Sequence, residues 1–209
     1  MNLFLKIYKK IYADAKLCEK AISEIFTSVV ATGILNVGNK GSVGVSLKIY
    51  ETRFCFVCSH FAANTDQLEK RNSDFRNTKQ FLKFQDDKSA NSIDLEQHDT
   101  IFWFGDLNYR VDAISLNDTL KYISLNLFDE LVKFDQLTNE RRNMRVFDSY
   151  LEGKLNFRPT FKFVMKSDLY EKQVEILNSQ NLAENDLIGK VKLPSWTDRV
   201  LWKSSEKVY

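Results

Sequence analysis

Apolar residues form short runs along the chain, and these runs predict the strands of a sheet. Four runs rich in β-branched and aromatic residues predict strands over 27–35, 42–50, 53–61 and 101–104. The closing segment "LPSWTDRVLWK" ends in a further apolar run that predicts a buried strand. The segment "FRPTFKF" is expected to be extended, because Pro159 disfavours helical geometry at the residue before it.

Apolar residues at helical spacing predict helices between these strands. A first helix is expected over 3–26, with one face formed by Leu3, Ile7, Ile11, Leu17, Ala21 and Ile25. A second is expected over 66–84, where Thr65 or Asp66 would cap it, and most of 115–147 is expected to be helical. Residues 166–189 predict a polar, partly helical insertion at the surface. This order of elements predicts an α/β or α+β fold with at least one sheet.

Length, composition and charge narrow the class of protein only a little. The chain has 209 residues, enough for one domain or for part of a larger one. Hydrophobic content of 44% and charged content of 28% are those of a globular protein, and a net charge of +2 does not point to nucleic acid. No apolar run has the length needed to cross a membrane. Lys6, Lys9 and Lys10 interrupt the start of the chain, which favours an amphipathic helix over a signal peptide.

The three cysteines, Cys18, Cys55 and Cys58, fit a reducing compartment. "CFVC" has the C-x-x-C spacing of zinc and redox sites, but it lies in a run that predicts a strand. Residues three apart in a strand point to opposite faces, so the two sulfur atoms are not expected to share a metal.

The stretch "IFWFGDLNYR" places polar residues directly after a predicted buried strand. Gly105 permits a close backbone approach or a positive φ. Asp106 and Asn108 lie two apart, so in an extended chain their side chains leave on the same side and suit a metal ion, a water or a phosphate. A polar turn after a core strand is the alternative, although such a turn does not require Tyr109 and Arg110 beside it.

Polar clusters recur at several predicted strand ends, and strand ends converge at one rim of a sheet. Alone, a histidine at a strand end is more often structural than catalytic, and a lysine in a glycine turn is usually solvated. Together the clusters offer cations at Lys40, Lys162, Lys190, Lys192, Arg110 and Arg199, neutral hydrogen-bonding groups at His60, Asn39 and Asn108, and acids at Asp106 and Asp198. This set suits an anion bearing several phosphates, with a divalent cation bridging to a carboxylate. Without a P-loop or a nucleophilic Cys or Ser motif, metal-assisted attack by water is favoured.

Five motifs carry a resemblance to a known family. "GNKGSVGVSL", "CSHFAAN", "HDTIFWFGDLNYRVD", "FRPTFK" and "KLPSWTDRVLW" occur in the order and style of the inositol polyphosphate 5-phosphatase catalytic domain. That family is similar to deoxyribonuclease I, exonuclease III and sphingomyelinase. The resemblance runs from about Val29 to Lys203. It implies a four-layer sandwich, in which two packed mixed β-sheets are flanked by helices. It also implies Mg²⁺-dependent removal of the 5-phosphate from phosphoinositides, such as phosphatidylinositol 4,5-bisphosphate, or from inositol polyphosphates.

The resemblance also implies roles for single residues. Asp106 would align or activate the attacking water and is a possible metal ligand, while Asn108 and His60 would hold the scissile phosphate. Asp198 and Arg199 would brace the site, and Tyr109 and Arg110 would shape and charge its wall. The cations expected at the 4-phosphate are Lys162, Lys190 and Lys192. Lys40, next to Asn39, would meet a ring phosphate on the other side.

The chain departs from the family pattern in places. Asn64, Phe161, Lys192 and Thr197 stand where the family has histidine, tyrosine, arginine and cysteine, which predicts a retuned substrate preference. Nothing before Val29 resembles the strand that carries the family's main metal ligand, a glutamate, and no terminal "SDH" motif occurs. Residues 1–209 are therefore expected to be a single partial domain, incomplete at both termini and inactive alone.

Two other functions remain open. One is a catalytically dead phosphoinositide-binding or scaffold module, and the other is a nuclease, which the inositol-phosphate motifs and the low net charge disfavour. The expected partners are a phosphoinositide headgroup at a membrane surface or a soluble inositol polyphosphate. The expected location is the cytoplasm, peripheral at membrane surfaces, and the pattern does not predict an oligomeric state.

Overall fold

The computed structural model describes residues 11–32, 40–85, 92–171, 173 and 192–205. Six strands form its main sheet, in the order β1-β2-β3-β6-β8-β7. Their bounds are β1 Ile22–Ala31, β2 Gly41–Ile49, β3 Thr52–His60, β6 Thr100–Asp106, β7 Leu151–Glu152 and β8 Asp198–Ser204. Neighbouring strands are antiparallel except β3 and β6, which are parallel. The sheet is therefore mixed, as expected.

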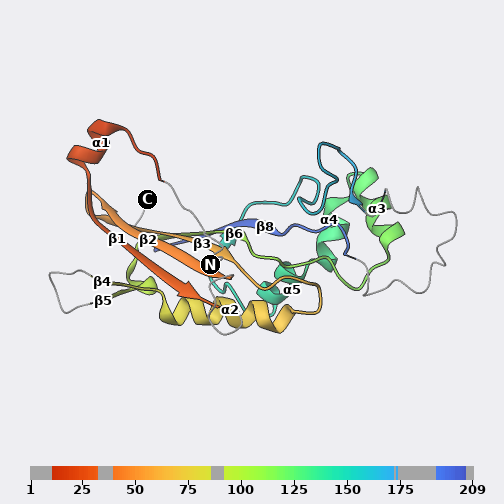
Figure 1. Ribbon diagram of the computed structural model, residues 1–209, viewed down its shortest axis with the longest axis horizontal. Coiled ribbons are helices and arrows are strands. Elements are labelled where there is room, and N and C mark those ends of the chain that lie inside the picture. The colour runs from red at the N-terminus through yellow and green to blue at the C-terminus, as the bar shows by residue number, and fades with distance from the viewer. Residues whose placement is uncertain (1–10, 33–39, 86–91, 172, 174–191, 206–209) are drawn as a thin grey trace, which may run out of the picture.

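Helices lie beside the sheet and beyond one end of it (Figure 1). The connection between the parallel strands carries α2 (Leu68–Phe81), which runs along one face of the sheet. The other helices are α1 (Ala15–Lys20), α3 (Leu116–Ser124), α4 (Phe128–Leu131) and α5 (Gln136–Arg142), with 3₁₀ turns η2 (Leu95–Gln97) and η3 (Val132–Phe134). β4 (Lys83–Gln85) and β5 (Ser92–Asp94) pair as a second, two-stranded sheet. The α/β class, the central mixed sheet and the flanking helices confirm the predicted fold class, although the second sheet among the described residues is an antiparallel pair and not a mixed sheet.

The main core lies between the sheet and α2. Alternate residues of the central strands, such as Val57 and Trp103, are fully buried there against Phe75 of α2. A second cluster packs around the buried Trp196 and is built largely by α3, α4 and the loops beside them. The segment after Asp106 runs from one cluster to the other, because Leu107 and Tyr109 belong to the first and Val111 to the second.

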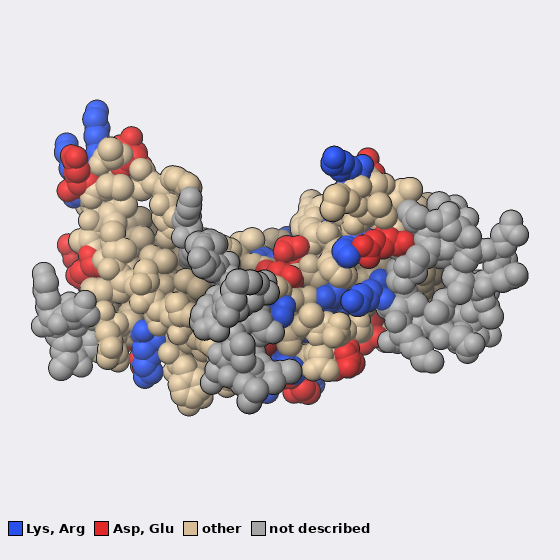
Figure 2. Space-filling model, viewed as in Figure 1, with Lys and Arg blue, Asp and Glu red and all other residues tan. Residues whose placement is uncertain are grey.

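The opposite face of the sheet is apolar and only partly buried. Phe56 stacks on Phe54 and on Phe102, with ring centroids 6.4 Å and 5.5 Å apart. On the outer strands Val29 and Val200 are 69% and 57% exposed. In Figure 2 the surface over β1 and β2 is mainly uncharged. We call this the open face of the sheet.

The N-terminal helix was predicted too long. Within its described part only Ala15–Lys20 is helical, and the chain enters β1 at Ile22. Pairing with β2 overrides the helical spacing there, and a register irregularity between Ser23 and Phe26 accommodates it. The cap of α2 was also wrong, because Gln67 holds the N-cap position and its side chain forms no capping hydrogen bond.

Some expectations fall outside the described residues: the helix over 3–10, the strand end at 33–35 and the insertion over 174–189. Cys55 and Cys58 lie in β3, one buried and one half-buried, and neither forms a disulfide. In the part of the chain that the structure describes, no helix is both long and apolar enough to span a membrane.

Candidate functional site at one end of the open face

Three of the predicted catalytic residues lie side by side across the sheet. His60 at the end of β3 pairs in register with Asp106 of β6, which pairs with Asp198 at the start of β8. His60 Nε2 lies 3.3 Å from Asp106 Oδ2, and the two side chains are 27% and 39% exposed. Asp198 is exposed as well. By alternation along β6, Asp106 lies on the same side as Phe102, so this row closes one end of the open face.

Gly105 allows the two central strands to approach closely just before this row. Its φ is +127°, and a Cβ built there would lie 2.2 Å from the carbonyl oxygen of Ser59. Any other residue would both strain the backbone and push β6 away from β3. The two possibilities raised by the sequence, a positive φ and a close approach, are thus both present.

Lys40 lies at this row rather than on a separate side of the site. Its Nζ is 2.5 Å from His60 Nε2. Burial lowers the pKa of the Lys40 ammonium, and the Asp106 carboxylate acts in the opposite direction. The arrangement places a cation beside the imidazole and the carboxylate, where an anionic group could be held.

Asn108 turns away from the position that an extended chain would give it. Its φ is +56°, and its backbone N–H donates to Asp106 Oδ1 at 3.2 Å. The side chain is buried: Nδ2 donates to the carbonyl of Phe61, and Oδ1 accepts from Arg110. The expectation that Asp106 and Asn108 leave on the same side is therefore wrong, because the turn directs the amide inward.

Tyr109 and Arg110 form the inner wall of this turn. Tyr109 is fully buried, and its hydroxyl donates to Asn72 Oδ1 at 3.0 Å. Burial raises the pKa of Tyr109 and lowers that of Arg110. Arg110 Nε donates to the carbonyl of Asn108, and its guanidinium lies 4.2 Å from the centroid of the Phe161 ring. Both side chains therefore lie on the buried side of the turn and support it there.

The segment 157–163 reaches the same row through Thr160. Its hydroxyl donates to Asp198 Oδ2 at 3.0 Å, and Phe161 pairs with Ser195 through two backbone hydrogen bonds. The next residue, Lys162, is held by Glu171, with Nζ 2.6 Å from Oε1 and both side chains about half exposed. Lys192 is exposed, whereas Asn39 and Lys190 lie outside the described residues.

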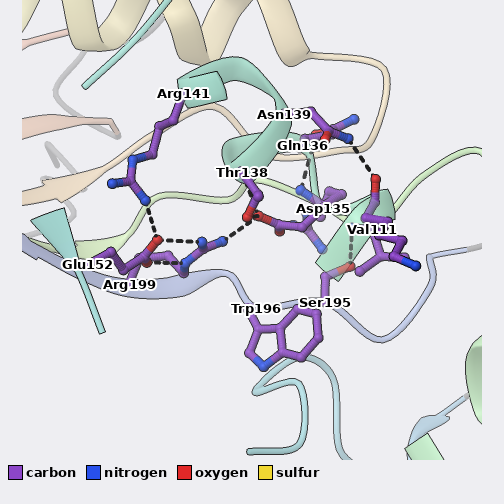
Figure 3. Close-up of polar contacts among 12 residues, drawn as sticks. Val111, Asp135, Gln136, Thr138, Asn139, Arg141, Glu152, Ser195, Trp196 and Arg199 are labelled. Carbon is purple, nitrogen blue, oxygen red and sulfur yellow. Dashed lines mark hydrogen bonds and ion pairs between the residues drawn. The ribbon is translucent and has the colours of Figure 1, made fainter. Parts of the chain in front are cut away.

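Arg199 corrects a prediction, because it is not available to a ligand. Its side chain is completely buried between Asp135 and Glu152 (Figure 3). Burial alone would lower the pKa of Arg199, but the two carboxylates hold it above its usual range. This arginine therefore braces the segment that carries Asp198, and only that part of its expected role fits the structure.

Several residues around the site were not singled out from the sequence. Thr160 contacts Asp198, and Arg71, Asp135 and Gln136 hold the loops from below. Arg71 and its neighbours in α2 resemble a solvated helix face in the sequence, because polar residues dominate the helix. No local pattern reports that this face is buried.

Oxygen donors for a metal ion are few in the described part of the chain. No group of three or more His, Cys, Asp or Glu side chains that could hold a metal is found there. Asp106 and Asp198 do lie opposite each other in an antiparallel pair, where side chains are neighbours. Mg²⁺ prefers oxygen ligands, is commonly bound through one or two carboxylates, and keeps several waters. These two carboxylates fit such an ion.

A mixed sheet that presents a histidine, two carboxylates and Lys40 at one end has the donors and charges that suit a phosphorylated ligand. The comparison with family models identifies the class of protein. Residues 4–209 match the model described as Endonuclease/Exonuclease/phosphatase family 2, and the chain belongs to that family.

Individual relatives point to inositol 5-phosphatases. The chain is 35% identical over 184 residues to the mouse type II inositol 1,4,5-trisphosphate 5-phosphatase, covering 87% of this chain and 17% of that protein. It is 36% identical over 204 residues to the Arabidopsis thaliana type I inositol polyphosphate 5-phosphatase 2, covering 94% of this chain and 29% of the relative. The chain thus spans less than a third of these two relatives.

A solved structure shares the fold. The inositol polyphosphate 5-phosphatase domain of SPsynaptojanin, in complex with inositol (1,4)-bisphosphate and calcium ion, superposes with a TM-score of 0.74 at 28% identity. The match covers 91% of this chain and 49% of that one. The recognition made from the five motifs is confirmed.

Proposed function

We propose that this chain carries part or all of a phosphatase site that removes the 5-phosphate of a phosphoinositide or an inositol polyphosphate. One observation supports it most strongly: His60, Asp106 and Asp198 lie in register at one end of a sheet whose relatives are inositol 5-phosphatases. These three side chains reach solvent, whereas those of Asn108 and Arg199 beside them are buried.

In this proposal the charge and hydrogen-bonding capacity of each side chain in the row set its role. Asp106 accepts a proton or a hydrogen bond from the attacking water, and His60 donates to the scissile phosphate. Lys40 lies beside the imidazole and offsets the negative charge of the phosphate. Asn108 acts through position, since it fixes the turn after Asp106, and Asp198 joins the row to Thr160.

Mg²⁺ is the proposed cofactor, and Asp106 with Asp198 would hold it. When bound, such an ion stabilises charge on phosphoryl oxygens and favours ionisation of a bound water. The lysines Lys162, Lys190 and Lys192 are proposed to meet a second phosphate such as the 4-phosphate. Because phosphoinositides are lipids, we propose the cytoplasmic surface of a membrane as the location.

The test is phosphate release from phosphatidylinositol 4,5-bisphosphate vesicles by the natural full-length protein, with and without Mg²⁺. Asp106→Asn keeps the shape of the side chain and removes its charge, and we expect it to lower turnover by about 10²-fold or more. Asp129→Asn is the matched control, because Asp129 is an exposed carboxylate that pairs with Lys154 at the surface. It should leave turnover unchanged.

Two outcomes would count against the proposal. Equal turnover in the Asp106→Asn and control variants would remove Asp106 from the chemistry. Tight binding of the headgroup without phosphate release in the wild-type protein would instead identify a binding or scaffold module.

A further inference from the structure

The start of α5 makes contacts with three separate site-bearing segments. Gln136, the first residue of this helix, is 6% exposed, and its side-chain amide makes four hydrogen bonds. Oε1 accepts from Arg71 Nη2 at 2.6 Å and from the backbone N–H of Arg110 at 3.0 Å. Nε2 donates to the carbonyl of Thr65 at 3.1 Å and to Asp112 Oδ2 at 3.3 Å. Both lone pairs and both hydrogens of the amide are thus used.

Arg71 extends this contact to the loop that follows His60. Its guanidinium is fully buried, and burial lowers its pKa to about 10. Besides Gln136 it donates to the carbonyls of Ala62 at 3.1 Å, Asn64 at 2.5 Å and Thr65 at 3.2 Å. The loop after β3 is therefore fixed by one buried cation, and Gln136 fixes that cation.

The preceding residue, Asp135, makes the third connection. It is the N-cap of α5, and its Oδ2 accepts from the backbone and the hydroxyl of Thr138, both at 2.8 Å. The same oxygen accepts from Arg199 Nη1 at 2.9 Å. Arg199 directly follows Asp198 in β8, so the N-cap of α5 is joined to the start of that strand (Figure 3).

We infer that Asp135 and Gln136 form a positioning element that sets His60, Asp106 and Asp198 relative to one another. Each of these three residues lies within four positions of a segment that the pair holds: 62–65, 110–112 and 199. The inference rests on the proposed function for the reaction being positioned. Gln136 is the principal positioning residue, because it alone contacts two of the three segments.

The physical reason is that buried polar groups tolerate only one arrangement. A shift of either loop would leave Arg71, the Arg110 N–H or the Gln136 amide buried without a partner. Apolar contacts are non-directional and would allow small displacements of the same loops. A displacement of about 1 Å can cost on the order of 10²-fold in rate, so this directional restraint matters for turnover.

The alternative is that the pair only stabilises the fold, and two variants with one control separate the two readings. Gln136→Met keeps a straight side chain of similar volume and removes every hydrogen bond of the amide. Gln136→Glu keeps an acceptor for Arg71 and the Arg110 N–H, but places a second acceptor against Thr65. Ser115→Ala is the control, since Ser115 is the N-cap of α3, accepts from the Asp118 N–H at 3.0 Å and contacts no site loop.

The first measurement is site-resolved amide hydrogen exchange on the folded full-length protein. We expect Gln136→Met to speed exchange of the Arg110 amide and of 62–65 by about 10-fold or more. In Gln136→Glu the Arg110 amide should stay within about 3-fold of the wild type while 62–65 exchanges faster. Ser115→Ala should change neither segment.

The second measurement is turnover, with kcat and KM determined separately. In Gln136→Met we expect kcat to fall by roughly 10–10²-fold with KM within about 3-fold, because the lysines that meet the substrate lie on other segments. Exchange and turnover no different from Ser115→Ala would overturn the inference. If the wild type shows no turnover, the proposed function fails, and the exchange result still decides whether Gln136 holds the loops.

Discussion

Removing the Arg199 guanidinium should be among the most destabilising single changes in this chain. Arg199 Nε and Nη2 donate to the two oxygens of Glu152 at 2.6 Å and 2.9 Å, and Nη1 donates to Asp135 at 2.9 Å. The Arg199 and Asp135 side chains are completely buried, and that of Glu152 is 8% exposed. Arg199→Met would fill much of the same space without the charge.

The magnitude follows from what remains buried. Breaking a buried ion pair by removing one partner costs about 3–5 kcal/mol, because the other charge stays unpaired. Glu152 keeps Arg141, at 2.7 Å, and Asp135 keeps two donors from Thr138, so the lower end, about 3 kcal/mol, is expected here. A domain is stable by only about 5–15 kcal/mol, so this loss would be plain in any unfolding experiment.

The assay is urea unfolding at neutral pH, followed by circular dichroism. Arg199→Lys keeps the charge but lacks the planar fork, and should lose about 1–3 kcal/mol. Arg142→Met, at an exposed arginine that ends α5, should stay within about 0.5 kcal/mol of the wild type. Asp135→Asn combined with Arg199→Met should cost less than the sum of the two single changes, because neither charge is then left alone.

A loss below about 1 kcal/mol for Arg199→Met would refute this reasoning. It would mean that the Asp135 and Glu152 carboxylates become hydrated or protonated in the native state at little cost in free energy. The same result would weaken the view that the start of α5 anchors β8.

Two further predictions concern pH and substrate choice. Burial lowers the pKa of His98 below its ordinary value of 6.5, so the unfolded state binds the proton first and stability should fall as pH drops below about 6.5, by at most ~1.4 kcal/mol per pH unit. His98→Asn should flatten this dependence in urea unfolding, and an unchanged slope would assign it to other groups. Lys162→Ala should weaken binding of a 4,5-bisphosphate headgroup by about 1.5 kcal/mol, the lower end for a charged hydrogen bond, because Lys162 is half exposed and paired with Glu171. It should spare a ligand without the 4-phosphate. Glu171→Gln, which frees Lys162, should instead tighten binding of the bisphosphate. Calorimetry that finds equal effects on both ligands would show that Lys162 contributes only a non-specific positive potential.

The sequence predicted the strands of the central sheet well because their signal is local. Strands β2, β3, β6 and β8 are short apolar runs, and the motifs at their ends mark where they stop. Strand β1 was misplaced because apolar residues near Ile25 also fit helical spacing, and only pairing with β2 decides between the two.

The candidate site was predicted in its outer part and missed in its inner part. His60, Asp106 and Asp198 are strand-end residues, so their meeting follows from the order of strands. Asn108 turns inward because its φ is positive. The prediction treated "GDLN" as extended, and an extended chain has no positive φ. Gln136 contacts Thr65 and Arg71 across more than sixty positions, and no spacing rule connects residues that far apart.

The arrangement of polar and apolar surface explains why this site depends on distant residues. Around the row of His60, Asp106 and Asp198, one side of the sheet is apolar and partly exposed, so contacts on that side cannot fix the direction of polar side chains. On the other side α2 and α5 bring fully buried polar groups, such as Arg71 and Asp135, beneath the same strand ends. Besides Lys40 and Thr160, which contact the row directly, the inner side therefore supplies directional contacts that the apolar side does not. A substitution there should change the geometry of the row even where it touches none of its three residues.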